Sequence, residues 1–92
     1  MSRSDREKWR EKTRSAYPHQ VDLTSPTDGY GSAVEKGIMI FLENRIGTFD
    51  LFVEVRDGIP FVRYCFERQA DAASFYVLFG PSAEKAVLKK VG

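Results

Sequence analysis

The chain contains one cysteine, Cys65, and one histidine, His19. A single cysteine excludes an internal disulfide and any cysteine-rich zinc site. Uncharged apolar stretches such as residues 37–42 are far shorter than the roughly 20 residues that a membrane-spanning helix needs. No apolar core follows the charged N-terminus, as it would in a secretory signal peptide. We therefore expect a cytoplasmic protein that makes no membrane contact.

The sequence also lacks the residue constellations that carry chemistry. Gly29-Tyr30-Gly31 is too short for a phosphate-binding loop, and no serine lies in a nucleophile elbow. His19 lies near Asp22 without a second histidine or a nucleophile, which is typical of a surface histidine. Cys65 has no neighbouring base except Arg63, so we expect an inert thiol. These absences predict a protein that is not an enzyme and that uses no metal or cofactor.

Charge is unevenly distributed along the chain. Residues 1–16 hold six basic and three acidic side chains, a net charge of +3. Because the whole chain is +1, residues 17–92 carry −2. We expect residues 1–17 to form a charged N-terminal helix or arm and residues 18–92 to form one domain. The arm is either a solvated terminus, a segment that docks through Trp9, or a contact for a partner or for phosphates. Its candidate contact residues are Arg3, Arg6, Arg10 and Arg14.

The first half of the domain shows weak strand and stronger helix signals. Val21 and Leu23 alternate with polar residues, which predicts a short strand over 20–23. A loop rich in Ser, Thr, Pro, Asp and Gly follows at 24–32. Ser32 and Glu35 have the spacing of a capping box, and apolar residues then recur at helical intervals up to Ile46. We expect a helix over 32–46, although residues 38–42 also fit a buried strand.

The strongest local signal is the Asp57-Gly58 pair between two alternating segments. Asp and Gly tolerate the positive φ that both positions of a type I′ turn require, so the pair predicts a β-hairpin. The turn sets Arg56 opposite Ile59 and therefore fixes the whole register. One face of the hairpin, the predicted core, then holds Phe49, Leu51, Val53, Val55, Val62, Tyr64 and Phe66. The opposite face holds Phe52, Glu54, Phe61, Arg63, Cys65 and Glu67.

The last third of the chain predicts one helix and one ambiguous segment. Ala72, Phe75 and Phe79 recur at three- and four-residue spacing from Asp71, before Gly80 and Pro81 end the helix. We expect this helix to pack on the core face of the hairpin. Residues 82–91 fit either a helix or an edge strand, and the helix is slightly favoured.

The predicted order βαββα, or βαββαβ if the tail adds a strand, is that of a ferredoxin-like α+β domain. Residues 58–66 and the helix after them resemble the third strand and second helix of an RNA-recognition motif. That family has the strand pattern Lys/Arg-Gly-aromatic-Gly/Ala-Phe-Val-x-aromatic. Gly58, Phe61, Val62 and Tyr64 match it, whereas Asp57, Ile59 and Pro60 depart from it. The likeness covers about residues 32–80 and implies Phe61 as a base-stacking position.

Phe52, Phe61 and Arg63 form the candidate binding surface, because two phenylalanines on an otherwise polar strand face are unusual. Three interpretations are open for this patch: a protein interface, cover by the N-terminal helix, or stacking of single-stranded nucleic acid. We expect a non-catalytic interaction module that binds another protein or a second copy of itself through this face or the adjacent sheet edge. The alternatives are a nucleic-acid-binding protein and a small-molecule regulatory domain with a pocket between the 24–32 loop and the sheet.

Overall fold

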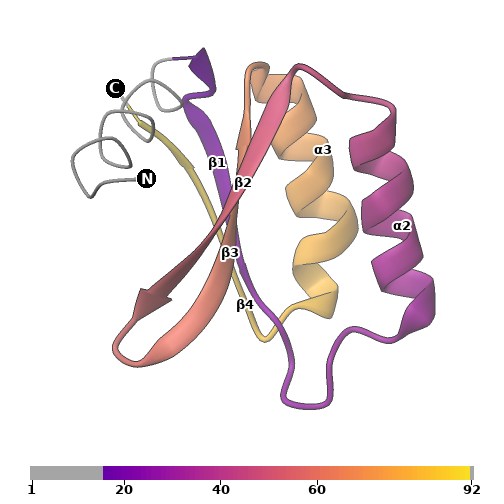
Figure 1. Ribbon diagram of the computed structural model, residues 1–92, viewed down its shortest axis with the longest axis vertical. Helices are drawn as coiled ribbons and strands as arrows, with labels where there is room; N and C mark the ends of the chain where they lie inside the picture. Colours follow the sequence, from indigo (N-terminus) through magenta and orange to yellow (C-terminus); the bar gives the residue numbers. More distant parts are fainter. Residues whose placement is uncertain (1–15, 92) are drawn as a thin grey trace, which may run out of the picture.

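The computed structural model describes residues 16–91, which form an α+β domain. In chain order the elements are β1 (His19–Thr24), α2 (Ser32–Glu43), β2 (Phe49–Arg56), β3 (Ile59–Phe66), α3 (Gln69–Phe79), a short 3-10 helix (Gly80–Ser82) and β4 (Lys85–Lys90). Figure 1 shows the four strands as one twisted sheet with α2 and α3 lying side by side next to it. The predicted α+β class is confirmed.

The four strands pair antiparallel in the order β2-β3-β1-β4. Strands β1 and β2 are both antiparallel to β3, so they run parallel to each other with β3 between them. Helix α2 connects them. Strands β3 and β4 are related in the same way, with β1 between them and α3 as the connection. β1 is therefore a central strand, and β2 and β4 are the two edges.

The predicted hairpin is confirmed in its turn and in its register. Asp57 and Gly58 have φ of 53° and 78°, the two positive values that a type I′ turn requires. Arg56 pairs with Ile59, and the predicted pairs continue to Phe49 with Phe66. The short strand expected at 20–23 is also present, as β1, with Val21 and Leu23 fully buried.

Helix α2 begins at Ser32 as predicted, but the capping box does not form. Gly31 is the N-cap residue, at φ 83°, and no side chain caps the helix. The Glu35 amide donates instead to the Gly31 carbonyl, 3.1 Å away. Ser32 is thus already inside the first turn, one residue too late to cap. The helix ends at Glu43 rather than at 46, and Ile46, expected on its apolar face, is exposed in the turn that follows.

An aromatic cluster between the helices and the sheet forms the centre of the core. The ring of Phe75 is fully buried, and its centroid lies 4.5 Å from that of Tyr64 and 5.3 Å from those of Phe41 and Phe66. The centroid of the Phe79 ring lies 4.9 Å from that of Phe75, so Phe79 also belongs to the cluster. Edge-to-face and tilted rings at such distances stabilise a core beyond the area that they bury. Packing of the second helix on the core face is therefore confirmed.

Arg45 joins the end of α2 to the start of α3. Its Nε donates to Asp71 Oδ1 at 2.9 Å and its Nη1 donates to the Phe41 carbonyl at 3.0 Å. The guanidinium also lies 3.6 Å from the centroid of the Phe41 ring. One side chain thus satisfies a carbonyl at the helix end and fixes the spacing between the two helices.

The tail is strand β4, so the helix favoured for residues 82–91 is wrong. β4 pairs with β1 over its whole length, and backbone bonds from Glu84 to Thr24 and from Val91 to Pro18, both 2.8 Å, extend the ladder at its two ends. Without β4, the backbone of buried β1 would lack partners on one side, which is costly. That requirement outweighs the ambiguous pattern of Ala86 to Val91.

Three of the seven residues on the predicted core face are exposed. Phe49, Val62, Tyr64 and Phe66 belong to the core or pack against it. In contrast, Leu51, Val53 and Val55 on β2 are 41%, 66% and 66% exposed. Figure 1 shows the reason: β2 is the sheet edge, and the tip of the hairpin projects away from the two helices. Their assignment to the core is wrong.

Candidate functional site

The sheet face opposite the helices is called the outer face here. Because side chains alternate along each strand, the pairing places the same-face neighbours of Phe61 and Arg63 on all four strands. The outer face holds Gln20, Asp22 and Thr24 of β1, Asp50, Phe52, Glu54 and Arg56 of β2, Phe61, Arg63 and Cys65 of β3, and Lys85, Val87 and Lys89 of β4. The candidate residues Phe52, Phe61 and Arg63 do share this face, as predicted.

Phe61 is not an open stacking surface. Its side chain is only 7% exposed. The guanidinium of Arg56 lies 5.0 Å from the ring centroid, and that of Arg63 lies 5.5 Å from it. These are cation–π distances, so the two arginines occupy the space that a nucleic-acid base would need. Phe52 is half-buried. In this structure Phe61 therefore offers no exposed ring face for base stacking.

Asp22 is the centre of the outer face, and it is 4% exposed. Arg63 binds its carboxylate with two hydrogen bonds, Nε to Oδ1 at 2.9 Å and Nη2 to Oδ2 at 3.1 Å. Lys89 Nζ lies 3.4 Å from Oδ2, and Arg56 Nη2 lies 3.9 Å from it. Three cations from three strands thus surround one buried carboxylate. The hydrogen bonds that Arg63 donates to Asp22 raise the pKa of Arg63 above its usual value, although burial opposes this.

This arrangement changes the role of Arg63. A guanidinium whose hydrogen bonds go to a buried carboxylate holds β3 to β1 and is not available to bind a partner. Sequence reasoning missed Asp22 as its counterion. The available signal was a charged residue between the apolar Val21 and Leu23, but only the strand order places Asp22 opposite Arg63.

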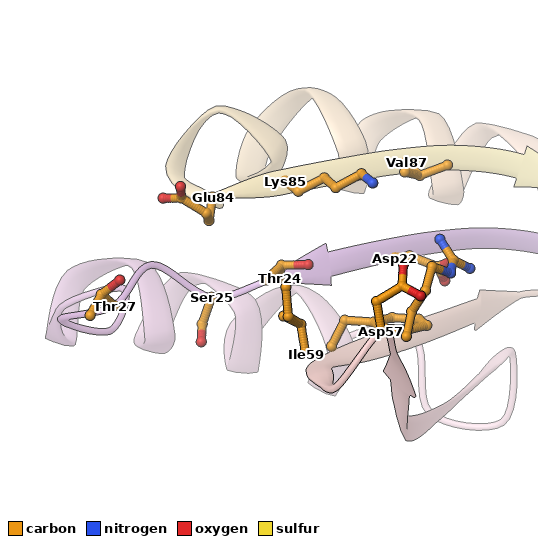
Figure 2. A pocket seen from close by; sticks show the side chains of 11 residues that line it. Asp22, Thr24, Ser25, Thr27, Asp57, Ile59, Glu84, Lys85 and Val87 are labelled. Carbon is orange, nitrogen blue, oxygen red and sulfur yellow. The ribbon is translucent and has the colours of Figure 1, made fainter.

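A pocket of about 370 Å³ lies on the outer face, where β1 enters the loop. Figure 2 shows Glu84 and Lys85 on one side of Thr24, and Asp57 and Ile59 of the hairpin tip on the other. Its lining includes both signs of charge, three hydroxyl groups and three apolar side chains. The lining side chains are Asp22, Thr24, Ser25, Thr27, Arg56, Asp57, Ile59, Phe61, Glu84, Lys85 and Val87. A pocket between the 24–32 loop and the sheet is what a small-molecule domain requires.

The two sheet edges differ in chemistry. Edge strand β4 carries Lys85, Lys89 and Lys90, and lysines on an edge discourage pairing with another chain. Edge strand β2 instead presents Leu51, Val53 and Val55, the exposed residues of the predicted core face, which we call the β2 apolar row. An exposed apolar edge strand is a site where a further strand can pair. The β2 edge is therefore the candidate interaction site.

Other sequence-predicted features contribute little to this site. Within residues 16–91, no group of three or more His, Cys, Asp and Glu side chains could hold a metal ion. Cys65 is buried in β3, and His19 is half-buried at the start of β1. None of the helices in this part of the chain is long and apolar enough to cross a membrane.

The N-terminal contact residues Arg3, Arg6, Arg10 and Arg14 lie outside the described residues, as does Trp9. The geometry of the site thus rests on the sheet, its hairpin and its two edges. No protein-family model, curated protein or solved structure significantly matches this chain.

Proposed function

We propose that this domain is a non-catalytic protein-interaction module that binds a second copy of itself by strand addition to the β2 edge. The observation that carries the proposal is the contrast between the edges: lysines on β4, and the β2 apolar row, 41–66% exposed, on β2. In strand addition, main-chain hydrogen bonds supply affinity and alternate side chains supply specificity. The β2 edge offers both, whereas Phe61 and Arg63 on the outer face are already engaged within the domain.

The strand order supports a finer description of the fold. We propose that the domain is ferredoxin-like, because its order is βαββαβ and each βαβ unit has another strand between its two parallel strands. In this arrangement β2 is an edge at which the sheet has room to grow. The fold itself hosts many functions, so the site carries the functional argument.

A dilution series of amide NMR spectra tests the proposed site residue by residue. If copies bind through β2, the amide shifts of Leu51, Val53 and Val55 move on dilution. Shifts of the lysine-bearing edge β4 stay constant and serve as an internal control. Concentration-dependent shifts confined to β4 or to α3, or spectra that do not change with concentration, would contradict the proposal.

The pocket on the outer face favours a second candidate function, the binding of a small zwitterion. Asp57 and Glu84 supply carboxylates and Lys85 supplies an ammonium group around a space of about 370 Å³ that Ile59, Phe61 and Val87 also line. Such a site suits an amino acid with an apolar side chain. Titration with leucine, followed by thermal unfolding, tests this: binding raises the melting temperature of the wild type but not that of Lys85→Ala. An unchanged melting temperature at saturating leucine would exclude leucine as the ligand.

A further inference from the structure

The backbone of β2 presents every second residue to the open edge. In the Asp57-Gly58 turn the Arg56 carbonyl accepts from the Ile59 amide, so the Arg56 backbone points toward β3. Antiparallel ladders alternate, so the backbone groups of Leu51, Val53 and Val55 point outward. One side-chain contact agrees with this: the Leu51 amide donates to Asp50 Oδ1 at 2.8 Å. The outward backbone groups and the β2 apolar row belong to the same three residues.

We infer that two copies of this chain pair β2 to β2, antiparallel, with Val53 on the two-fold axis. The inference rests on the proposed function and specifies the register and symmetry of the pairing between the two copies. In this register Val53 faces Val53, Leu51 faces Val55 and Asp50 faces Arg56 of the other copy. The two sheets join into one, with the helices of both copies on the same face.

Charge complementarity selects this register from its neighbours. Only a register shift of two residues, which moves the two-fold axis by one residue, keeps the outward backbone groups opposite each other and the apolar row on one face. If the axis moves to Phe52, Asp50 faces Glu54, so two like-charged pairs form. If it moves to Glu54, the two Glu54 side chains face each other. With Val53 on the axis, both charged cross-strand pairs are attractive, and such pairs stabilise a sheet.

Pairing requires both charged side chains to change partners. Arg56 is about half exposed, with 48% of its side chain open, and its 3.9 Å contact with Asp22 is the longest in the cluster around that carboxylate. Its guanidinium also lies 5.0 Å from the centroid of the Phe61 ring, and on pairing it exchanges these two contacts for Asp50 of the second copy. Asp50 accepts a hydrogen bond from the neighbouring Leu51 amide. On pairing, that amide gains a carbonyl partner across the interface, and the Asp50 carboxylate turns to Arg56 of the second copy.

Single cysteine variants test the register directly. Directly opposed residues in a hydrogen-bonded pair have Cα atoms about 5.5 Å apart, within the range that a disulfide spans. Val53→Cys is therefore expected to form a covalent dimer under mild oxidation. The matched variants Leu51→Cys and Val55→Cys are not, because each would lie more than about 13 Å from its own copy. The native Cys65 is buried and does not compete.

Failure of the register is distinguishable from failure of the proposed function. A wild-type dimer with efficient cross-linking at Phe52→Cys or Glu54→Cys instead of Val53→Cys would overturn the register and leave edge pairing intact. A monomeric wild type without cross-linking at any β2 position would overturn both. Cross-linking at Val53 alone supports both.

A charge exchange gives a second, independent test. Asp50→Arg leaves two arginines at the paired positions of each copy, and Arg56→Asp leaves two aspartates. Each variant alone is expected to self-associate about tenfold more weakly, because both charged pairs become repulsive. An equimolar mixture is expected to form the heterodimer with restored affinity, since every pair is again attractive. Circular dichroism confirms that each variant is folded. A mixture no tighter than the separate variants would contradict the pairing of Asp50 with Arg56.

Discussion

Arg63 and Asp22, 41 residues apart in the sequence, form a two-point ion pair across the centre of the sheet. The pair joins β3 to β1, the two central strands, on the face that has no helices. Because both side chains are largely buried, each requires the other as a partner. The pair therefore holds the two central strands of the sheet together.

Loss of the Asp22 carboxylate should destabilise the domain. Asp22→Asn is expected to lower the free energy of unfolding by about 3 kcal/mol, since it leaves the buried Arg63 guanidinium without a counterion. Lys89→Met removes a more exposed partner of the same carboxylate and should cost less than about 1 kcal/mol. Urea unfolding of both variants measures the difference. Equal losses would show that Arg63 is not the principal partner of Asp22.

The stability of the hairpin turn should depend on its backbone conformation rather than on side-chain contacts. Gly58 has φ 78°, and an added Cβ would meet no atom within 4 Å. Gly58→Ala is thus expected to cost about 1–2 kcal/mol from left-handed strain alone. Asp57→Asn should be nearly neutral, because Asn is favoured at this turn position. Urea midpoints measure both effects, and a neutral Gly58→Ala would mean that the turn has a different conformation in solution.

Stability should fall at high pH through Tyr64. Burial raises the pKa of its phenol from 10.0 to about 12. Between these values the unfolded chain loses this proton and the folded chain keeps it, so unfolding becomes more favourable as pH rises. The contribution is complete below pH 10 and is lost as pH rises through about 12. Urea midpoints measured across this range should fall less steeply for Tyr64→Phe than for the wild type. Parallel profiles would contradict the assignment.

Local sequence signals predicted the hairpin well. Its turn depends on two adjacent residues, Asp57 and Gly58, and the two-residue period of a strand carries the register outward from them. The spacing of Ala72, Phe75 and Phe79 likewise predicted a helix from Asp71, and the helix begins two residues earlier, at Gln69. In these segments the local conformational preference of the sequence agrees with the conformation that the tertiary structure requires.

The parts that sequence could not predict depend on strand order. Nothing local indicates that β3 lies beside β1, so neither the Arg63–Asp22 pair nor the burial of Phe61 follows from local patterns. Alternation predicted which face Val53 occupies, but not that the helices stop short of it. The tail has apolar residues at Ala86, Val87 and Leu88, a pattern that fits either a helix or a strand. It forms a strand because β1 needs a hydrogen-bonding partner on its open side.

The central claim, that the β2 edge binds another chain, is tested most directly by absolute molar mass from light scattering across a concentration series. The account predicts that the wild type rises from the monomer mass of 10.5 kDa toward twice that value, and that Val53→Lys remains a monomer. Val77→Lys is the matched control, since Val77 is 70% exposed on α3 and Val53 is 66% exposed on β2. A wild type that stays at the monomer mass at every concentration, or a dimer that Val53→Lys leaves intact, would contradict it.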